Sequence, residues 1–306
     1  MREIRRRETN MPVTLISGCS TGIGLACAVH FARKGHRVYA TMRNPSAGED
    51  LMDLAHGESL DLRIFALDVN VQSSVDACLA SVIGESGAVD VLINNAGILG
   101  GGSIEETDIE VFRANMETNY IGSIRMIKAV LPVMRAQKSG AIVNISSVWA
   151  RAAMTPLSPY AASKAAIDVF SDALAQEVRP FGIRVHVMEP GIVETPMTTA
   201  KPTVKFDPAS PYAGPTMRAL PFLQSRALDR WPPELVAQAI DEALAAPVPK
   251  VRHAVGWDAE YMMAARARMT DEEWANFGLQ KSADEIAAFW RDKCRIDPVT
   301  FQPIKP

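Results

Sequence analysis

Two side chains capable of acid–base chemistry, Tyr160 and Lys164, stand four positions apart in the segment Tyr-Ala-Ala-Ser-Lys. Residues at this spacing share one face of an α-helix, so the ammonium is expected beside the phenol. A tyrosine with its ordinary pKa near 10 is a poor base at neutral pH, and lowering that pKa by about three units takes about 4 kcal/mol. A neighbouring cation contributes in that direction. The pattern therefore predicts Tyr160 as a proton donor and acceptor for a substrate oxygen.

Ser147 precedes Tyr160 by thirteen positions and is predicted to hold the reacting oxygen by a hydrogen bond. No Gly-x-Ser-x-Gly segment surrounds it, which argues against a role as an acyl-transfer nucleophile. Taken alone, a tyrosine and a lysine four apart are more often a solvated pair on a helix. The prediction therefore depends on the segments that position these residues.

A glycine-rich loop runs from Ser17 to Gly24, between an apolar run at 13–17 and an amphipathic stretch at 23–34. Glycines in such a loop allow a tight turn and close backbone approach to a pyrophosphate, and the helix N-terminus offers free N–H groups to the anion. An ordinary strand-to-helix turn is the alternative. The predicted dinucleotide contacts in this loop are Gly18, Ser20, Gly22, Ile23 and Gly24.

The end of the second predicted strand reads Met42-Arg43-Asn44, with no acid before Glu49. An acid at this place would bind a ribose 2′-hydroxyl, whereas an arginine accepts a 2′-phosphate. The sequence therefore favours NADP over NAD, which remains possible; a solvated cation is the alternative for Arg43. With such a cofactor, Tyr160 would take the hydroxyl proton as hydride leaves an alcohol, and protonate the oxygen in the reverse direction.

Short apolar runs alternate with stretches of helical length along most of the chain, which predicts an α/β fold with a doubly wound parallel sheet of the Rossmann type. Ligands in such folds bind at the carboxyl ends of the strands, where the strand order reverses. Later strand ends carry further candidate cofactor contacts, namely Asp68, Val69, Asn95, Ala96, Gly97, Pro190 and Gly191. The predicted strands are 13–17, 37–41, 62–67, 89–93, 141–146, 183–188 and 251–255.

The chain is predicted to form one dinucleotide-binding and catalytic domain over residues 11–258, followed by a C-terminal helical extension over 259–306. The proline-rich stretch 195–231 interrupts the alternation and is interpreted as a substrate lid. Its apolar side chains would either roof a nonpolar substrate or pack on the enzyme's own core; they are Met197, Phe206, Tyr212, Met217, Leu220, Phe222 and Leu223.

Composition excludes several classes of function. The 306 residues carry a net charge of −3, with basic and acidic residues scattered, so no nucleic-acid footprint is expected. No apolar run approaches the ~20 residues of a membrane span. The basic stretch 1–10 is not followed by a signal-peptide core, and we expect a cytoplasmic protein. The four cysteines and five histidines lack metal-ligand spacing, so no metal site is predicted.

The glycine loop, Asn94-Asn95-Ala96-Gly97, Ser147, Tyr160-x3-Lys164 and Pro190-Gly191 occur in an order and spacing that resemble the classical short-chain dehydrogenase/reductase family, over roughly residues 11–198. The resemblance implies further roles. Asn119 corresponds to a fourth catalytic residue that holds a water in a proton relay to Lys164. Lys164 and Tyr160 also contact the nicotinamide ribose, and Val193 and Thr195 hold the carboxamide. Met42 stands where NAD-preferring members carry aspartate.

Residues 38–43, 233–240 and 251–258 are similar to the retinol and 17β-hydroxysteroid dehydrogenase branch, which implies an apolar or bulky alcohol or ketone. A non-catalytic NADP(H)-binding sensor or regulator is the alternative function; the complete set of Asn119, Ser147, Tyr160 and Lys164 argues against it. Sugar-nucleotide epimerase chemistry is disfavoured by the glycine spacing and the lack of a substrate domain. Family members usually pair through the helices that carry Asn119 and Tyr160, so a homodimer or homotetramer is expected.

Overall fold

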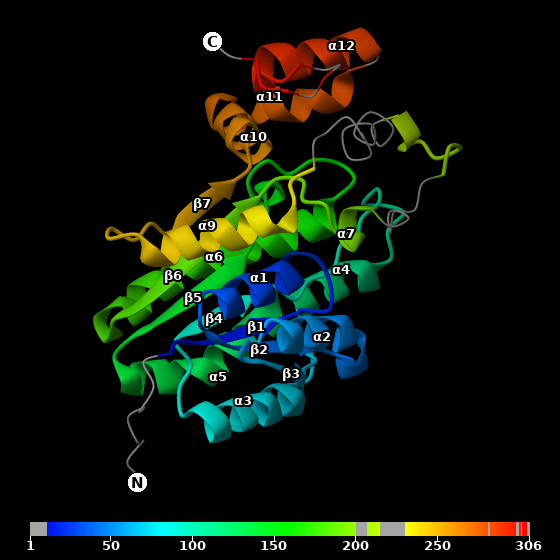
Figure 1. The fold of residues 1–306 in the computed structure, drawn as a ribbon. Helices are drawn as coiled ribbons and strands as arrows, with labels where there is room; N and C mark the ends of the chain where they lie inside the picture. Colours follow the sequence, from blue (N-terminus) through cyan, green and yellow to red (C-terminus); the bar gives the residue numbers. More distant parts are fainter. Residues whose placement is uncertain are drawn as a thin grey trace.

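The computed structural model describes residues 11–199, 207–214, 230–280, 282–297, 300 and 302–304. Seven parallel strands form one sheet in the order β3-β2-β1-β4-β5-β6-β7 (Figure 1). The strand order reverses beside β1, so the predicted doubly wound α/β sheet is confirmed. The strands are β1 Val13–Ser17, β2 Arg37–Met42, β3 Leu62–Ala66, β4 Val91–Asn94, β5 Gly140–Ile145, β6 Ile183–Pro190 and β7 Arg252–Val255.

The central strands are apolar on both faces because helices cover the sheet on both sides. All five residues of β1 are buried, and so are the four of β4. The bounds of β1 are as predicted, and the ends of the other strands differ from the predicted ones by at most two residues. Strand β6 continues to Pro190 because Glu189 and Pro190 pair with Ala254 and Val255 of β7.

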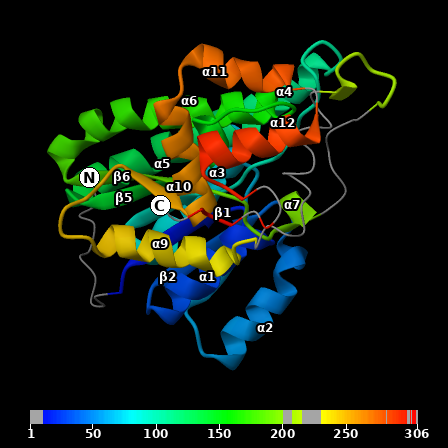
Figure 2. The ribbon, with the colours of Figure 1, turned by 90° about the horizontal axis from the view of Figure 1, so that it is seen from above.

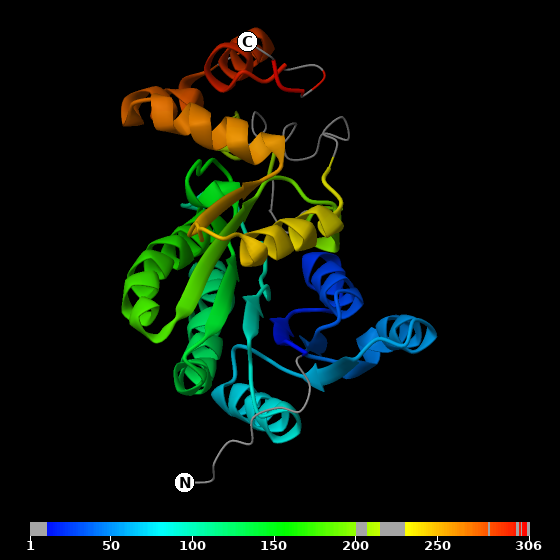
Figure 3. The same ribbon diagram turned by 60° about the vertical axis from the view of Figure 1, so that its left-hand side comes forward.

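Three helices pack on one face of the sheet and three on the other (Figure 3). The first group is α1 Gly22–Arg33, α2 Glu49–Gly57 and α9 Pro233–Ala245, and the second is α3 Gln72–Ser86, α5 Gly122–Gln137 and α6 Ser158–Val178. Each group contributes to its own apolar core, with Phe31 and Ile240 in the first and Met126 and Leu174 in the second. Short helical turns lie between these elements, at Pro45–Gly48, Val148–Ala150 and Arg179–Phe181.

Helix α4, Ile109–Asn115, continues without interruption through a π-helical turn at Met116–Ile121 into α5. A π turn accommodates an extra residue in a helix and often marks a functional site. Here it contains Asn119, which is 2% exposed.

The C-terminal residues fold into helices at the carboxyl end of the sheet (Figures 1 and 2). They are α10 Trp257–Arg268, α11 Asp271–Ala275, the 3-10 turn Asn276–Leu279, α12 Ala283–Ala288 and the π turn Phe289–Cys294. Their apolar side chains, including Met262, Phe277 and Trp290, share a third core with Trp149 and Met154. This extension therefore packs on the loop that follows Ser147.

Most of the predicted lid, 195–231, falls on residues that the structure does not describe, among them Phe206, Met217, Leu220, Phe222 and Leu223. The described part begins with the short helix α7, Pro196–Thr199. Met197 and Tyr212 are exposed, at 42% and 36%. Within the described residues, no helix has the length and apolar character needed to cross a bilayer.

Candidate functional site

A cavity of about 500 Å³ lies at the carboxyl ends of β1, β2, β4, β5 and β6. It is the place at which a doubly wound sheet binds its ligand. Two predicted residues do not line it, Gly24 and Asn119. The others all do: Gly18, Ser20, Gly22, Ile23, Arg43, Asp68, Val69, Asn95, Ala96, Gly97, Ser147, Tyr160, Lys164, Pro190, Gly191, Val193 and Thr195.

The glycine loop can accommodate a pyrophosphate, because its glycines carry no side chains and the N-terminus of the following helix has no side-chain cap. Gly18 has a φ of +75°, and a Cβ there would come within 2.9 Å of Ala96 Cα. A Cβ on Gly24 would collide with the carbonyl oxygen of Gly18, so this glycine packs the helix on the strand and faces no ligand. Thr21, at the N-cap of α1, makes no side-chain cap, which leaves first-turn N–H groups free for an anion.

Asn95 holds the glycine loop in place. Its Nδ2 donates to the carbonyl oxygens of Ser17 and Gly18, at 3.0 and 2.9 Å. The Ser17 hydroxyl in turn accepts from the backbone N–H of Asn95 and of Ala96, at 3.0 and 3.1 Å. Asn95 lines the cavity, as predicted, and its bonds with Ser17, a role that the sequence did not indicate, join the ends of β1 and β4.

Tyr160 and Lys164 lie on one face of α6, as their spacing predicted. The Lys164 Nζ is 5.7 Å from the centroid of the Tyr160 ring and donates to the carbonyl oxygen of Ile145 at 2.7 Å. The Ser147 side chain faces that of Tyr160 and acts to lower the pKa of its hydroxyl. Hence α6 and the end of β5 bring the three side chains together on the wall of the cavity.

Burial governs the titration of this group. It raises the pKa of Tyr160 to about 12, with the Ser147 hydrogen bond acting in the opposite direction. It lowers the pKa of Lys164 to about 8, opposed by the negative charge of Asp168. The side chains of the protein alone therefore do not lower the Tyr160 pKa as the acid–base role requires.

Asn119 reaches the site through backbone contacts. Its Oδ1 accepts from the N–H of Ile98 at 2.8 Å, and its Nδ2 donates to the Ile98 carbonyl and to Ser163 Oγ, at 3.0 and 2.9 Å. The side chain thus ties the loop after β4 to α6, between Tyr160 and Lys164. The water relay that the resemblance implies for Asn119 stays a prediction.

Arg43 and Asp68 stand at the opposite end of the cavity. Arg43 is exposed, and no ion pair joins it to a carboxylate within the described part of the chain. Asp68 Oδ1 accepts from the N–H of Asn70 at 2.9 Å, which shapes the turn after β3.

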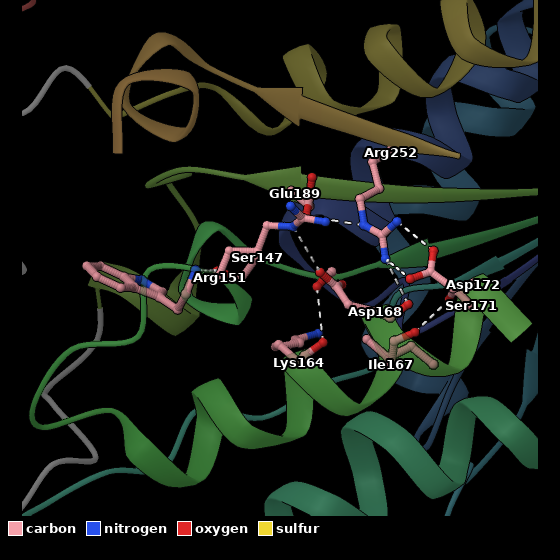
Figure 4. A network of polar contacts seen from close by, with 11 residues as sticks. Ser147, Arg151, Lys164, Ile167, Asp168, Ser171, Asp172, Glu189 and Arg252 are labelled. Atoms are coloured by element: carbon pink, nitrogen blue, oxygen red, sulfur yellow. Dashed lines mark hydrogen bonds and ion pairs between the residues drawn. The ribbon is translucent and has the colours of Figure 1, made fainter. Parts of the chain in front are cut away.

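A charged cluster that the sequence analysis missed lies behind Lys164 (Figure 4). Asp168, one turn further along α6, and Glu189, at the end of β6, are only 4% and 2% exposed. Arg151 Nε lies 2.8 Å from Glu189 Oε1 and 3.8 Å from Asp168 Oδ2, and Arg252 pairs with Asp172 at 2.6 Å. The available signal was Glu189, an acid inside an apolar strand.

Comparisons with known proteins agree with this geometry. The family model described as short chain dehydrogenase matches residues 12–205. Human retinol dehydrogenase 8 is 42% identical over 186 residues, which span 59% of this chain and 58% of that protein. A crystal structure of a short-chain dehydrogenase from Streptomyces avermitilis superimposes with a TM-score of 0.76 at 33% identity, covering 89% of this chain and all of that one.

An actinorhodin polyketide ketoreductase solved with NADPH gives a TM-score of 0.70 at 29% identity, over 80% of this chain and 96% of that one. The family match covers more than half of the chain and includes the glycine loop, Ser147, Tyr160 and Lys164. The protein thus belongs to the short-chain dehydrogenase/reductase family of oxidoreductases and is similar to its retinol dehydrogenase branch.

Proposed function

We propose that this protein interconverts an alcohol and a carbonyl by hydride transfer with NADP(H), acting on an apolar or bulky substrate. The observation that carries the proposal is the Tyr160, Lys164 and Ser147 group on the wall of the cavity that the glycine loop also lines. A bound nicotinamide dinucleotide would supply or accept the hydride.

The protein's own side chains would handle the proton. In reduction, the Tyr160 hydroxyl donates its proton to the substrate oxygen; in oxidation, its phenolate takes the proton back. Ser147 donates a hydrogen bond to the same oxygen and stabilises the charge that develops there. Lys164, held by Ile145, stabilises the phenolate and would contact the nicotinamide ribose. Asn119 fixes the loop after β4 beside Lys164.

The direct test is a Tyr160→Phe variant, which should still bind NADPH but lose turnover. We expect kcat for carbonyl reduction to fall by about 10²- to 10⁴-fold, the usual contribution of a general acid, with NADPH binding retained because the glycine loop and Arg43 would still hold the cofactor. Tyr120→Phe is a matched control, because Tyr120 packs on Phe170 with ring centroids 5.9 Å apart and does not line the cavity. If Phe at position 160 leaves turnover intact, the catalytic role is wrong. A wild-type protein that binds NADPH but turns over no carbonyl would favour the sensor function.

Arg43 supports the choice of NADP over NAD, because it lines the cavity with no described carboxylate partner and follows Met42 in place of an acid. We expect Arg43→Gln to weaken NADPH binding about tenfold, or about 1.4 kcal/mol, and to leave NADH binding nearly unchanged. Fluorescence titration with both cofactors measures this, with Arg113→Gln on the exposed surface of α4 as control. Equal loss for both cofactors would remove Arg43 from the 2′-phosphate site.

An apolar substrate is supported by the similarity to retinol dehydrogenase 8. A panel of carbonyl compounds that runs from small polar ketones to long aliphatic and polycyclic ones tests the class. Turnover restricted to the small polar members would contradict it.

We also propose a cytoplasmic homodimer or homotetramer that pairs through the α4–α5 and α6 helices. Exposed apolar side chains on these helices support this surface, with Ile109 58% and Val169 71% exposed. Light scattering of the wild type and of a Val169→Glu variant measures the assembly. A monomeric wild type would contradict it.

A further inference from the structure

The loop after β6 is fixed by a buried carboxylate from a distant part of the chain. Asp258, in the first turn of α10, is 5% exposed. Its Oδ2 accepts from the backbone N–H of Ile192 at 2.7 Å, and its Oδ1 accepts from the indole Nε1–H of Trp231 at 2.8 Å. One carboxylate thus contacts α10, the loop after β6 and the chain segment that leads into α9.

The backbone at Gly191 and Gly256 packs closely around the Asp258 carboxylate and the Trp231 indole. A Cβ on Gly191 would collide with both oxygens of Asp258, and a Cβ on Gly256 would collide with the Trp231 indole. Burial raises the pKa of the Asp258 carboxyl, and the hydrogen bonds from Ile192 and Trp231 oppose that shift. An acidic residue in the first turn of a helix can also act simply by stabilising the helix dipole. That role would not require the hydrogen bonds from Ile192 and Trp231, because both residues lie outside α10.

Near Asp258, the chain on either side of the stretch 195–230 is joined by backbone hydrogen bonds. Val193 and Trp231 form a parallel bridge, with Trp231 N donating to Ile192 O at 3.0 Å and Glu194 N donating to Trp231 O at 2.8 Å. Thr198 Oγ1 donates to Val193 O at 2.6 Å. Gly191, Val193 and Thr195 line the cavity, so their position follows from this junction.

We propose that Asp258 is a positioning residue for the nicotinamide half of the cofactor: its carboxylate holds residues 191–195 at the cavity through Ile192 and Trp231. The inference rests on the proposed function, because residues 191–195 matter to binding only if a dinucleotide occupies the cavity. It also makes helix α10 contribute to the shape of the binding site, since Asp258 lies in the first turn of this helix.

The test compares a whole dinucleotide with its adenosine half. NADPH fills both ends of the site, whereas 2′,5′-ADP reaches only the end near Arg43. We expect Asp258→Ala to raise the Kd for NADPH at least about tenfold and to leave the Kd for 2′,5′-ADP within about twofold, because two buried donors lose their acceptor at one end of the site. NADH and ADP replace this pair if the wild type prefers NADH.

Two further variants divide the effect. An amide oxygen can replace only one of the two acceptors, so Asp258→Asn should recover part of the affinity, and Trp231→Phe removes one arm while Ile192 keeps its bond. Glu260→Gln, on the exposed side of α10, is the control and should behave as wild type. The proposal would be overturned if Asp258→Ala, Asp258→Asn and Trp231→Phe all bound NADPH as the wild type does. It would also be overturned if they weakened the binding of NADPH and of 2′,5′-ADP equally. A wild type that binds neither dinucleotide would instead refute the proposed function.

Discussion

Lys164 is a lysine whose charge is unfavourable to the fold that contains it. It is 5% exposed at the wall of the cavity, and burial lowers its pKa from 10.5 to about 8. A group whose pKa falls on folding binds fewer protons in the folded state, so its charge destabilises the protein at pH values below the folded pKa. At neutral pH the side chain is still mostly an ammonium, the form needed beside a phenolate. The proposed reaction accounts for its presence, whereas stability does not.

Replacement of Lys164 by methionine should therefore stabilise the protein while abolishing turnover. At pH 7 we expect the free energy of unfolding to rise by about 1 to 3 kcal/mol. The gain should shrink as the pH rises from about 8 towards 10.5, where the unfolded lysine also loses its proton. Urea denaturation at pH 7 and pH 10 measures both values, and a less stable variant at pH 7 would contradict this account.

At the scale of elements, the loop between β1 and α1 combines two requirements, since Gly18 leaves room for the loop after β4 and Gly24 lets α1 approach β1. Gly24→Ala should force these two elements apart, because its Cβ collides with a backbone carbonyl that cannot move alone. We expect a lower Tm and loss of NADPH binding. Gly84→Ala in α3 is the matched control: a Cβ there meets nothing within 4 Å, so helix propensity should stabilise the protein by up to about 1 kcal/mol.

Thermal denaturation and cofactor titration distinguish these two glycine variants. A Gly24→Ala protein that binds NADPH like the wild type would show that the helix can shift without cost to the site.

The sequence predicted those features whose signals lie in neighbouring residues, and it did not predict those that depend on distant segments. Strand ends with glycine, serine or asparagine are visible in the sequence, and they identified much of the cavity lining from Gly18 to Gly191, whereas Val193 and Thr195 came from the family resemblance. The contacts of Asn95, Asp168 and Asp258 were not predictable, because a polar residue buried by segments from elsewhere in the chain looks like any surface residue in the sequence. The same reason hides the packing of the C-terminal helices on Trp149, which depends on where the sheet ends.

At the scale of the whole molecule, the cluster of Asp168, Glu189, Arg151 and Arg252 joins α6, β6, β7 and the turn after Ser147 (Figure 4). Burial, with Glu189 nearby, raises the pKa of Asp168 to about 7. Because the folded state then holds a proton that the unfolded state releases above about pH 4, stability should fall as the pH rises from 4 to 7.

Asp168→Asn should flatten this part of the stability profile. One proton accounts for at most about 1.4 kcal/mol per pH unit, and the variant lacks it. Asp172→Asn is the control: Arg252 lowers the pKa of that half-exposed carboxyl, so its contribution lies below pH 4 and has the opposite sign. Urea denaturation at pH 5, 6, 7 and 8 measures the slope. A slope unchanged by Asp168→Asn would show that another group titrates in this range.

The π turn at Met116–Ile121 fixes the number of residues between α4 and α5, whatever side chains these residues carry. Removing one residue there would return the turn to α-helical geometry while α4 and α5 keep nearly their present orientation. The residues of the turn itself would shift, so Asn119 would lose its bonds to Ile98 and Ser163. Point substitutions on the outer surface of this helix should thus be tolerated, whereas single-residue insertions and deletions within it should not.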